Sequence, residues 1–413
     1  MPIKRYLLDD LKTHLPKKEM SLIVGPRQAG KTTLMLQLQE YLKKKDEKTL
    51  FLSLDFERDM PNFTTQAALL DRIRLEFGKQ KGHVFIDEIQ RKENAGIFLK
   101  GLYDMQMPYK FIISGSGSVE LKEKVHESLA GRKRMFELQT VSLREFINYK
   151  TGYKYEDKLN KYFSIKKAES LNLLMEYLNF GGYPRVILED TRSEKLKTID
   201  EIYRSYIEKD IAYLLKVERI DAFGNMIRIL AGQIGNMINL NELSSTLGIS
   251  VQTVRNYLAY AEKTFIVKRL TPYFRNIRKE ISKSPVLYFN DLGLRNFSIG
   301  QFGRYTMLSE MGFLFQSLVY RLLLEKIKDE GSTLHFWRTK DRAEVDFVIN
   351  RGEQVIPVEV KCREMKDKAI ARSLRGFISK YNPKEAWVVN ISLKDEEKIG
   401  QTRIKFIPVF ELI

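Results

Sequence analysis

The pattern of hydrophobic positions predicts the order of helices and strands along the chain. Between about residues 20 and 115, short apolar runs alternate with longer segments of helical periodicity. Parallel strands give such runs because helices cover both faces of their sheet. The pattern therefore predicts an α/β fold with a parallel sheet, whose strands we expect at Leu22–Val24, Leu50–Leu54, Val84–Ile86 and Phe111–Ile113.

Beyond residue 150 the periodicity changes. Residues 155–235 have apolar positions at helical spacing, which predicts a small helical domain. Residues 239–270 predict two short helices joined at Gly248, with a strand after them. From Tyr288 onward the pattern is mixed and predicts a long amphipathic helix near 306–327, followed by strands at 334–338, 343–349, 355–361 and 386–390.

The composition is that of a globular and strongly basic protein. Its 413 residues include 70 Lys and Arg against 53 Asp and Glu, a formal charge of +17 that favours polyanionic partners. One cysteine and four histidines argue against a disulfide framework and a Cys/His zinc cluster. There is no apolar run long enough for a transmembrane helix. The N-terminal segment has Asp9 and Asp10 where a signal peptide would need a continuous apolar region, so we expect a cytoplasmic protein.

A phosphate-binding loop follows the first apolar run. Residues 25–32 read Gly-Pro-Arg-Gln-Ala-Gly-Lys-Thr, a full match to G-x-x-x-x-G-K-[ST] between a predicted strand and a predicted helix. The glycines let backbone N–H groups surround a phosphate at the helix N-terminus. Lys31 would contact the β- and γ-phosphates, and the Thr32 hydroxyl would ligate Mg²⁺. The predicted nucleotide-binding residues are Gly25, Pro26, Arg27, Gln28, Ala29, Gly30, Lys31, Thr32 and Thr33.

An acidic pair follows the third apolar run. Asp87 would contact the magnesium ion, and Glu88 would activate the attacking water. Taken alone, the pair would fit a strand that runs into a helix cap equally well. Its place downstream of a full phosphate loop favours the nucleotide site.

Two further residues are candidates for contact with the γ-phosphate. Ser114 follows the fourth apolar run, where a polar side chain can sense this phosphate from the neighbouring strand, but a Gly/Ser loop is an equally good interpretation. Arg132 would stabilise the charge of the transferred phosphoryl group, either within its own chain or from a neighbouring subunit of an oligomer. The alternative for Arg132 is a solvated basic turn.

Residues 240–258 fit a helix–turn–helix. Gly248 would end the first helix and Ser250 would cap the second. Side chains near the exposed face of the second helix would contact double-stranded DNA, namely Gln252, Thr253, Arg255 and Asn256. The alternative is a helix pair that packs on another domain, and the net charge favours DNA. A basic wing would contain Arg275, Arg278, Lys279 and Lys283, although such a run is more often only a solvated face.

Residues 343–361 predict a β-hairpin with charged residues on one face. With a turn centred between Gly352 and Glu353, Asp346 lies opposite Glu359. Glu359 and Lys361 are two residues apart and so share a strand face. Two carboxylates and an ammonium would suit metal-dependent hydrolysis of a phosphodiester. An ordinary hairpin with a cross-strand ion pair is the alternative, which the spacing alone favours.

In this order the motifs resemble a known family. Gly-Pro-Arg-x-x-Gly-Lys-Thr, Ile-Asp-Glu-Ile-Gln, Ser-Gly-Ser and Leu-Ala-Gly-Arg precede Gly-Gly-Tyr-Pro, and Glu-Val-Asp-Phe with Glu-Val-Lys follow. This arrangement resembles the prokaryotic AAA-type ATPases with a C-terminal domain of unknown function, over nearly the whole chain. The resemblance implies a P-loop ATPase core (1–152), a helical lid (153–236), a winged helix–turn–helix (237–283) and a mixed α/β domain similar to restriction endonucleases (284–413).

The resemblance also implies ligands and a nuclease signature. ATP and Mg²⁺ would bind at the phosphate loop. Asp346, Glu359 and Lys361 match the Asp…Glu-x-Lys signature of the nuclease fold. Gln316 stands where that fold often has a glutamate, and a neutral amide is a poor metal ligand, which argues against nuclease activity.

We therefore interpret the sequence as an ATP-binding and ATP-hydrolysing protein whose nucleotide state controls a DNA- or partner-binding half. One alternative is an ATP-gated, metal-dependent DNA nuclease. Another is a nucleotide-sensing DNA-binding regulator with little turnover. A third is a basic surface that serves a protein partner.

Overall fold

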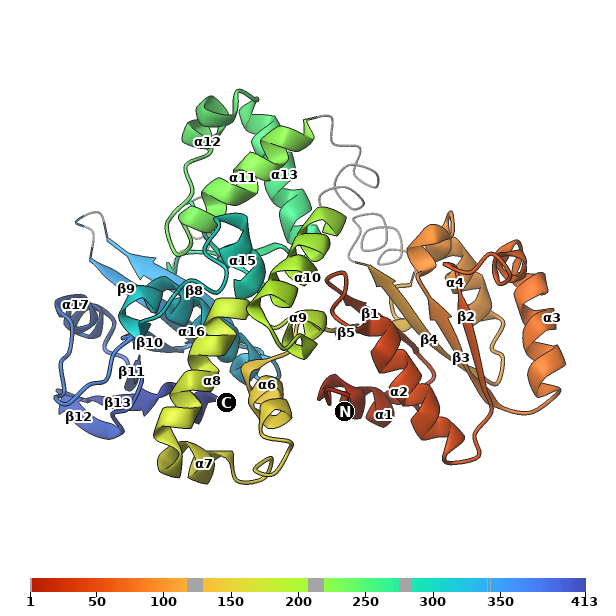
Figure 1. Cartoon of the computed structure of the whole chain (residues 1–413), viewed down its shortest axis with the longest axis horizontal. Helices are drawn as coiled ribbons and strands as arrows, with labels where there is room; N and C mark the ends of the chain where they lie inside the picture. The colour runs from red at the N-terminus through yellow and green to blue at the C-terminus, as the bar shows by residue number, and fades with distance from the viewer. Residues whose placement is uncertain (1, 117–128, 207–218, 275–283, 340, 342) are drawn as a thin grey trace.

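The computed structural model describes residues 2–116, 129–206, 219–274, 284–339, 341 and 343–413. Figure 1 shows an N-terminal α/β body beside a larger body of helices and a second sheet. The described residues form sheets of five, six and two strands. The residues predicted for a basic wing, Arg275, Arg278, Lys279 and Lys283, lie outside the described residues.

The N-terminal body is built on a parallel sheet with the strand order β2-β3-β4-β1-β5. The strands are β1 (Met20–Gly25), β2 (Thr49–Ser53), β3 (Gly82–Asp87), β4 (Tyr109–Ser116) and β5 (Lys133–Glu137). Because side chains alternate along each strand, the two faces bury separate hydrophobic clusters. One cluster lies against α1 (Leu7–His14) and α2 (Lys31–Lys43), and the other against α3 (Gln66–Phe77) and α4 (Ala95–Asp104). Strands β1 to β4 include the four predicted apolar runs or most of them, and the prediction of a parallel sheet is confirmed.

The middle of the chain is helical. It contains α6 (Leu143–Lys150), α7 (Leu159–Ile165), α8 (Lys167–Phe180), α9 (Pro184–Leu188), α10 (Arg192–Ser205) and α11 (Ile220–Gly232). The predicted pair of short helices follows as α12 (Leu240–Leu247) and α13 (Val251–Lys263). The side chains of Asn239 and Ser250 cap these two helices, and Gly248 ends the first in a left-handed conformation. An antiparallel pair, β6 (Val267–Leu270) and β7 (Val286–Phe289), comes next, followed by α15 (Leu292–Ser298).

The C-terminal sheet is mixed, with the order β12-β13-β11-β10-β9-β8. Its strands are β8 (Thr333–Arg338), β9 (Glu344–Arg351), β10 (Gln354–Val360), β11 (Glu385–Asn390), β12 (Asp395–Ile399) and β13 (Thr402–Pro408). Strands β9 and β10 pair in the predicted register, with Gln354 opposite Arg351 and Val358 opposite Phe347. The helices α16 (Gly312–Ile327) and α17 (Arg372–Tyr381) pack against this sheet. The predicted helix near 306–327 begins later, because residues Leu308–Met311 form a 3₁₀ turn.

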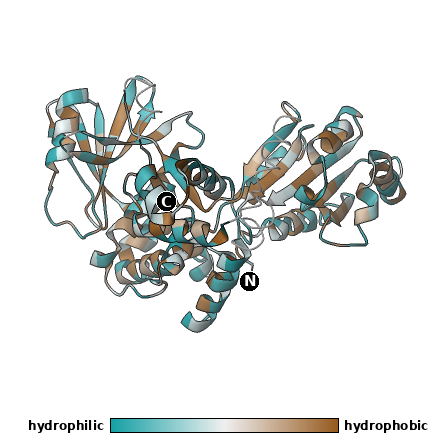
Figure 2. Cartoon of the chain, turned by 90° about the horizontal axis from the view of Figure 1, so that it is seen from above, coloured by the Kyte–Doolittle hydropathy of each residue, from teal (hydrophilic) through white to brown (hydrophobic). Residues whose placement is uncertain are grey.

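One hydrophobic core joins the helices to the C-terminal sheet. Apart from Ile3, its members extend from Val141 to Leu412, so it runs across the boundaries predicted at 152, 236 and 283. Within it, the side-chain amide of Asn296 in α15 donates to the carbonyl oxygens of Leu178 and Asn179 in α8, both at 2.9 Å. Figure 2 shows hydrophobic segments along the strands of both bodies. In the described part of the chain, every helix falls short of the length and hydropathy that a bilayer crossing requires.

Candidate nucleotide-binding site

The loop between β1 and α2 depends on two glycines. A Cβ added to Gly25 would lie 2.1 Å from the carbonyl oxygen of Leu138, which is far inside van der Waals contact. Gly30 has a φ of +94°, a backbone conformation that residues other than glycine rarely adopt. The sequence therefore needs glycine at both positions to give this loop its shape.

Lys31 opens α2 and turns back into the loop. Its side chain is only 6% exposed, and its ammonium donates to the carbonyl oxygens of Gly25 at 3.1 Å and Pro26 at 2.8 Å. The loop thus holds a buried cation at the N-terminus of a helix, where the helix dipole adds further positive potential. This arrangement suits a bound phosphate.

Three polar side chains from three elements meet beside the loop. The hydroxyl of Thr32 donates to Oδ2 of Asp87 at 2.7 Å, and the hydroxyl of Ser114 donates to Oδ1 of Asp87. They meet because β3 and β4 are parallel and in register, with Ile86 opposite Ile113, so both strands end at the same edge of the sheet. The hydroxyl of Thr32 and the carboxylate of Asp87 fit Mg²⁺, which takes few protein oxygens beside water and phosphate.

Glu88 occupies an unusual position at the end of β3. It has a left-handed φ of 57°, and its side chain lines the same cavity as Lys31 and Thr32. Burial raises the pKa of the Glu88 carboxyl above its usual value, although Lys31 acts in the opposite direction. A strained residue with a raised pKa in a cavity is typical of a functional carboxyl, and a raised pKa makes the carboxylate a stronger base.

The cavity lies between the two bodies of the molecule. It has a volume of about 600 Å³ and is lined by the loop, by α9 and by the N-terminal residues 2–5. Pro2, Ile3 and Leu188 give part of its wall an apolar character. A nucleotide with its phosphates on the loop would therefore contact both bodies.

Three arginines at this cavity were missed from the sequence, and two of them, Arg185 and Arg5, contact the phosphate loop, while Arg91 pairs with Asp55. Arg185 in α9 donates to Oε1 of Gln28 at 3.0 Å, and so reaches the loop from the helical region. Arg5 is buried and donates to the carbonyl oxygen of Ala29 at 2.8 Å, while its Nε pairs with Glu145 at 3.1 Å. The Gly-Gly-Tyr-Pro break before Arg185 marked a special position, but no signal in the sequence marked Arg5.

The structure does not bring Arg132 to the phosphate loop of its own chain. Its carbonyl oxygen accepts a hydrogen bond from the N–H of Met20, at the start of β1, whereas the loop begins at the other end of that strand. A six-residue strand is about 20 Å long. The guanidinium instead pairs with Asp104 at 2.7 Å. The prediction that Arg132 acts within its own chain is therefore wrong for this arrangement of the strands.

The second predicted constellation, in the C-terminal sheet, also comes together. The N–H of Val360 donates to Oδ2 of Asp346 at 2.7 Å, and the ammonium of Lys361 donates to Oε1 of Glu359 at 2.6 Å. The side-chain amide of Gln316 donates to Oδ1 of Asp346 at 2.8 Å. Burial, followed by the nearby Glu359, raises the pKa of Asp346 to about 8.

A divalent metal would have to displace groups that already occupy this constellation. The N–H of Val360 and the amide of Gln316 donate to the two oxygens of Asp346, and Lys361 donates to one oxygen of Glu359. The other oxygen of Glu359, Oε2, is buried and has no hydrogen-bond partner in the described part of the chain. Within the described residues, no group of three or more His, Cys, Asp or Glu side chains is placed to hold a metal ion. The nuclease activity that the resemblance implies therefore stays a prediction.

The four residues predicted to contact DNA do not share one face of α13. Gln252 and Asn256 are exposed and hydrogen-bonded to each other at 3.1 Å. Thr253 is half-buried, and its N–H bonds to the hydroxyl of Ser250. Arg255 is exposed but lines a second cavity, beside β6. Only Gln252 and Asn256 thus remain together on the outer face.

Comparison with protein families divides the chain into three matches. An AAA domain matches residues 17–147, and a domain of unknown function (DUF8612) matches residues 171–304. A second domain of unknown function (DUF4143) matches residues 311–412. The phosphate loop and the acidic pair lie in the first match, and Asp346, Glu359 and Lys361 lie in the third.

Relatives align with this chain over most of their length. Uncharacterized protein MJ1544 of Methanocaldococcus jannaschii is 27% identical over 373 residues, which cover 89% of this chain and 80% of that protein. Uncharacterized protein Rv2008c of Mycobacterium tuberculosis is 27% identical over 371 residues, which cover 89% and 75%. Among solved structures, the replication initiator DnaA bound to AMPPCP and single-stranded DNA aligns with 62% of this chain and 86% of that chain, at 16% identity and a TM-score of 0.32.

Proposed function

We propose that this protein, which joins an AAA-type P-loop ATPase domain to a C-terminal domain of unknown function, binds ATP with Mg²⁺ and hydrolyses it. The observation that carries the proposal is the meeting of Lys31, Thr32 and Glu88 on one cavity, with Asp87 bonded to Thr32. Each residue type suits its place, since phosphoryl transfer depends on positioning and on the neutralisation of charge.

In the proposed reaction, each side chain has one role. Mg²⁺, when bound, would neutralise charge on the β- and γ-phosphates. Lys31 would contact the phosphate oxygens, and Thr32 with Asp87 would hold the metal. Glu88 would orient the attacking water and accept its proton. Ser114 would act as a positioning residue, because its hydroxyl fixes Oδ1 of Asp87.

We also propose that the nucleotide state controls the larger body. The connector 138–141 supports this proposal, because it contacts both the N-terminal body and the larger body. The N–H of Leu138 donates to the carbonyl oxygen of Val24, just before the phosphate loop, at 2.8 Å. Arg321 in α16 donates to Thr140 Oγ1 at 3.3 Å, and α16 also carries Gln316, which contacts Asp346. Movement of the loop would thus reach α16.

Duplex DNA is the partner that we propose for the controlled half. The outer face of α13 presents Gln252 and Asn256, two amides that can bond adenine in the major groove. The net charge of +17 would add favourable contacts with phosphates.

The proposal is tested by steady-state ATP hydrolysis with and without double-stranded DNA. Lys31→Ala and Glu88→Gln should each lower turnover by about a hundredfold or more, because each removes a group that acts on the transferred phosphate. Glu76→Gln, on the exposed side of α3, is the matched control and should retain wild-type turnover. Tight ATP binding by the wild type with turnover no higher than that of Lys31→Ala would contradict hydrolysis. Turnover that DNA leaves unchanged would contradict control through DNA.

A further inference from the structure

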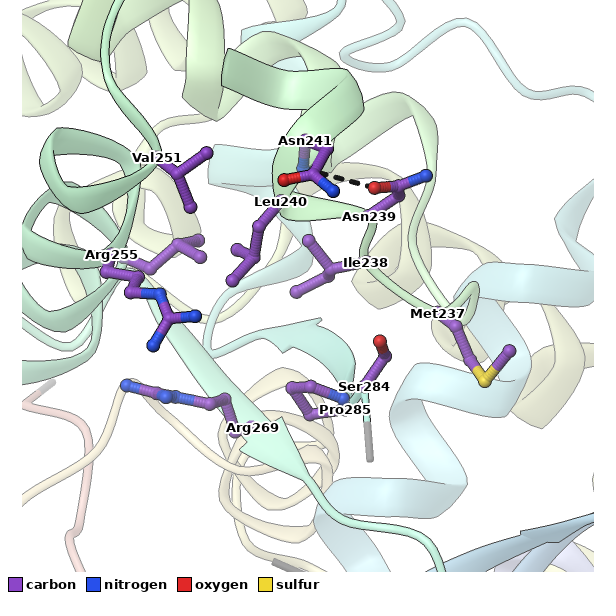
Figure 3. A pocket seen from close by; sticks show the side chains of 11 residues that line it. Met237, Ile238, Asn239, Leu240, Asn241, Val251, Arg255, Arg269, Ser284 and Pro285 are labelled. Atoms are coloured by element: carbon purple, nitrogen blue, oxygen red, sulfur yellow. Dashed lines mark hydrogen bonds between the residues drawn. The ribbon is translucent and has the colours of Figure 1, made fainter. Parts of the chain in front are cut away.

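A second cavity lies beneath the helix pair α12–α13, away from the phosphate loop. It has a volume of about 870 Å³, which is the size of typical small-molecule sites. Residues 237–241, the helix α13, strand β6 and residues 284–285 line it (Figure 3). The proposed ATPase activity uses none of these residues, so the cavity needs an explanation of its own.

The lining of this cavity combines an apolar floor with two cations. Ile238 and Leu258 are buried, and Leu240, Val251 and Pro285 add further apolar surface. Of the described residues that line it, Arg255 and Arg269 are charged and none is acidic. In Figure 3 the two guanidinium groups extend toward each other at one side of the cavity.

The two arginines differ in how their charge is balanced. Glu262 neutralises Arg269, since its carboxylate accepts from the Arg269 backbone N–H at 3.2 Å and from the guanidinium. The guanidinium of Arg255 makes no hydrogen bond or ion pair with the part of the chain that the structure describes. Its positive charge is therefore not balanced by any described carboxylate, and an anion beside it would be stabilised. The first turns of α12 and α13, which also line the cavity, add partial positive charge.

We propose that this cavity binds an organic anion with an apolar body, such as a medium-chain carboxylate. The anionic group would lie between Arg255 and Arg269, and the apolar body would lie against Ile238, Leu240 and Leu258. The apolar floor argues against a DNA phosphate as the occupant, because a phosphodiester would gain nothing from it. Since the ligand would contact α12, α13 and the β6–β7 pair at once, it would fix how these elements lie relative to each other.

Calorimetric titration of the full-length protein with decanoate tests the proposal. We expect saturable one-to-one binding, weakened about tenfold or more in Arg255→Gln and in Arg269→Gln, because each loses a charge-assisted hydrogen bond. Octanoate should bind about fifteenfold more weakly than decanoate, since it lacks two methylenes and each buried methylene contributes about fourfold. Arg228→Gln, an exposed arginine of α11 outside this cavity, is the matched control and should bind decanoate as the wild type does.

Four results would overturn the proposal. The first is an absence of saturable decanoate binding by the wild type. The second is equal affinity in Arg255→Gln. The third is equally tight binding of decyltrimethylammonium, which has the same chain and the opposite charge. The fourth is duplex DNA binding that depends on Arg255 while decanoate does not compete. Lys31→Ala should bind decanoate normally, so failure here and failure of the ATPase proposal can be told apart.

Discussion

Two half-buried carboxyl groups show how similar residues come to lie in different surroundings. Glu88 and Asp346 both have a raised pKa, and in both cases burial is the largest cause. Glu88 lines an open cavity beside Lys31, where a substrate and water can reach it. Asp346 instead accepts a hydrogen bond at Oδ1 from the side-chain amide of Gln316. The sequence placed both acids in the right pairs, but only the structure shows that Glu88 lines a cavity while Asp346 is bonded to a neutral amide.

The carboxyl of Asp346 predicts a specific pH dependence of stability. The pKa of Asp346 is about 8 in the folded chain, against 3.8 as its ordinary value. The folded state therefore holds a proton that the unfolded state has lost, so this residue lowers the free energy of unfolding as pH rises from about 4 to about 8. Asp346→Asn should remove this contribution, and urea unfolding at pH 5, 7 and 9 measures it. A slope of stability against pH that is identical in the variant and the wild type would contradict the raised pKa.

At the level of helices and strands, the sequence was most informative where apolar burial is strong. Strands β1 to β4 were predicted because their runs are apolar on both faces. Strand β5 was missed because it lies at the sheet edge and its Lys133–Glu137 segment buries only Phe136. Strand β12, Asp395–Ile399, was missed for a similar reason, since none of its residues is fully buried. The register of β9 and β10 was predictable because Gly352 fixes the turn.

The phosphate loop was equally predictable, because its function needs a local motif, whereas its distant neighbours were not. Arg185 and Arg5 reach the loop from segments far away in the chain, and their contacts depend on how the two bodies pack. Side chains brought together by packing leave no regular spacing in a sequence. The same is true of Arg255, whose place beside β6 depends on how α13 lies against the strand pair.

The loop between β1 and α2 gives a prediction at this scale. Gly25→Ala places a methyl group 2.1 Å from the Leu138 carbonyl, so the loop must move and ATP affinity should fall by about tenfold or more. Gly376→Ala is the matched control, because a Cβ there meets open space in the middle of α17. This control should stabilise the protein by about 0.5–1 kcal/mol and bind ATP normally. Equal ATP affinity in both variants, measured by calorimetry, would show that the loop does not need its present shape.

For the whole molecule, the position of the cavity determines what ATP can do. Its walls belong to both bodies, and the connector 138–141 links the loop to α8 and α16 through Tyr177 and Arg321. A nucleotide that stabilises this arrangement should therefore slow the hydrogen exchange of backbone amides beyond the residues that it contacts. The shared core, which contains Ile3 at the cavity and residues from Val141 to Leu412, can carry this protection to the larger body, because elements within one core open together more readily than separately.

Hydrogen exchange with a non-hydrolysable ATP analogue and Mg²⁺ measures how far this protection spreads beyond the residues that contact the nucleotide. At about one hundred times its Kd, a ligand stabilises the bound form by about 2.7 kcal/mol, so amides that exchange through opening of the cavity should slow by up to about a hundredfold. We expect this in residues 25–34 and in α9, and a smaller slowing in residues 138–142 and in α16. Lys31→Ala should show none of these changes. Protection confined to residues 25–34 and 82–88 would mean that the nucleotide acts on the N-terminal body alone, and the link through Arg321 to the C-terminal sheet would then serve stability rather than control.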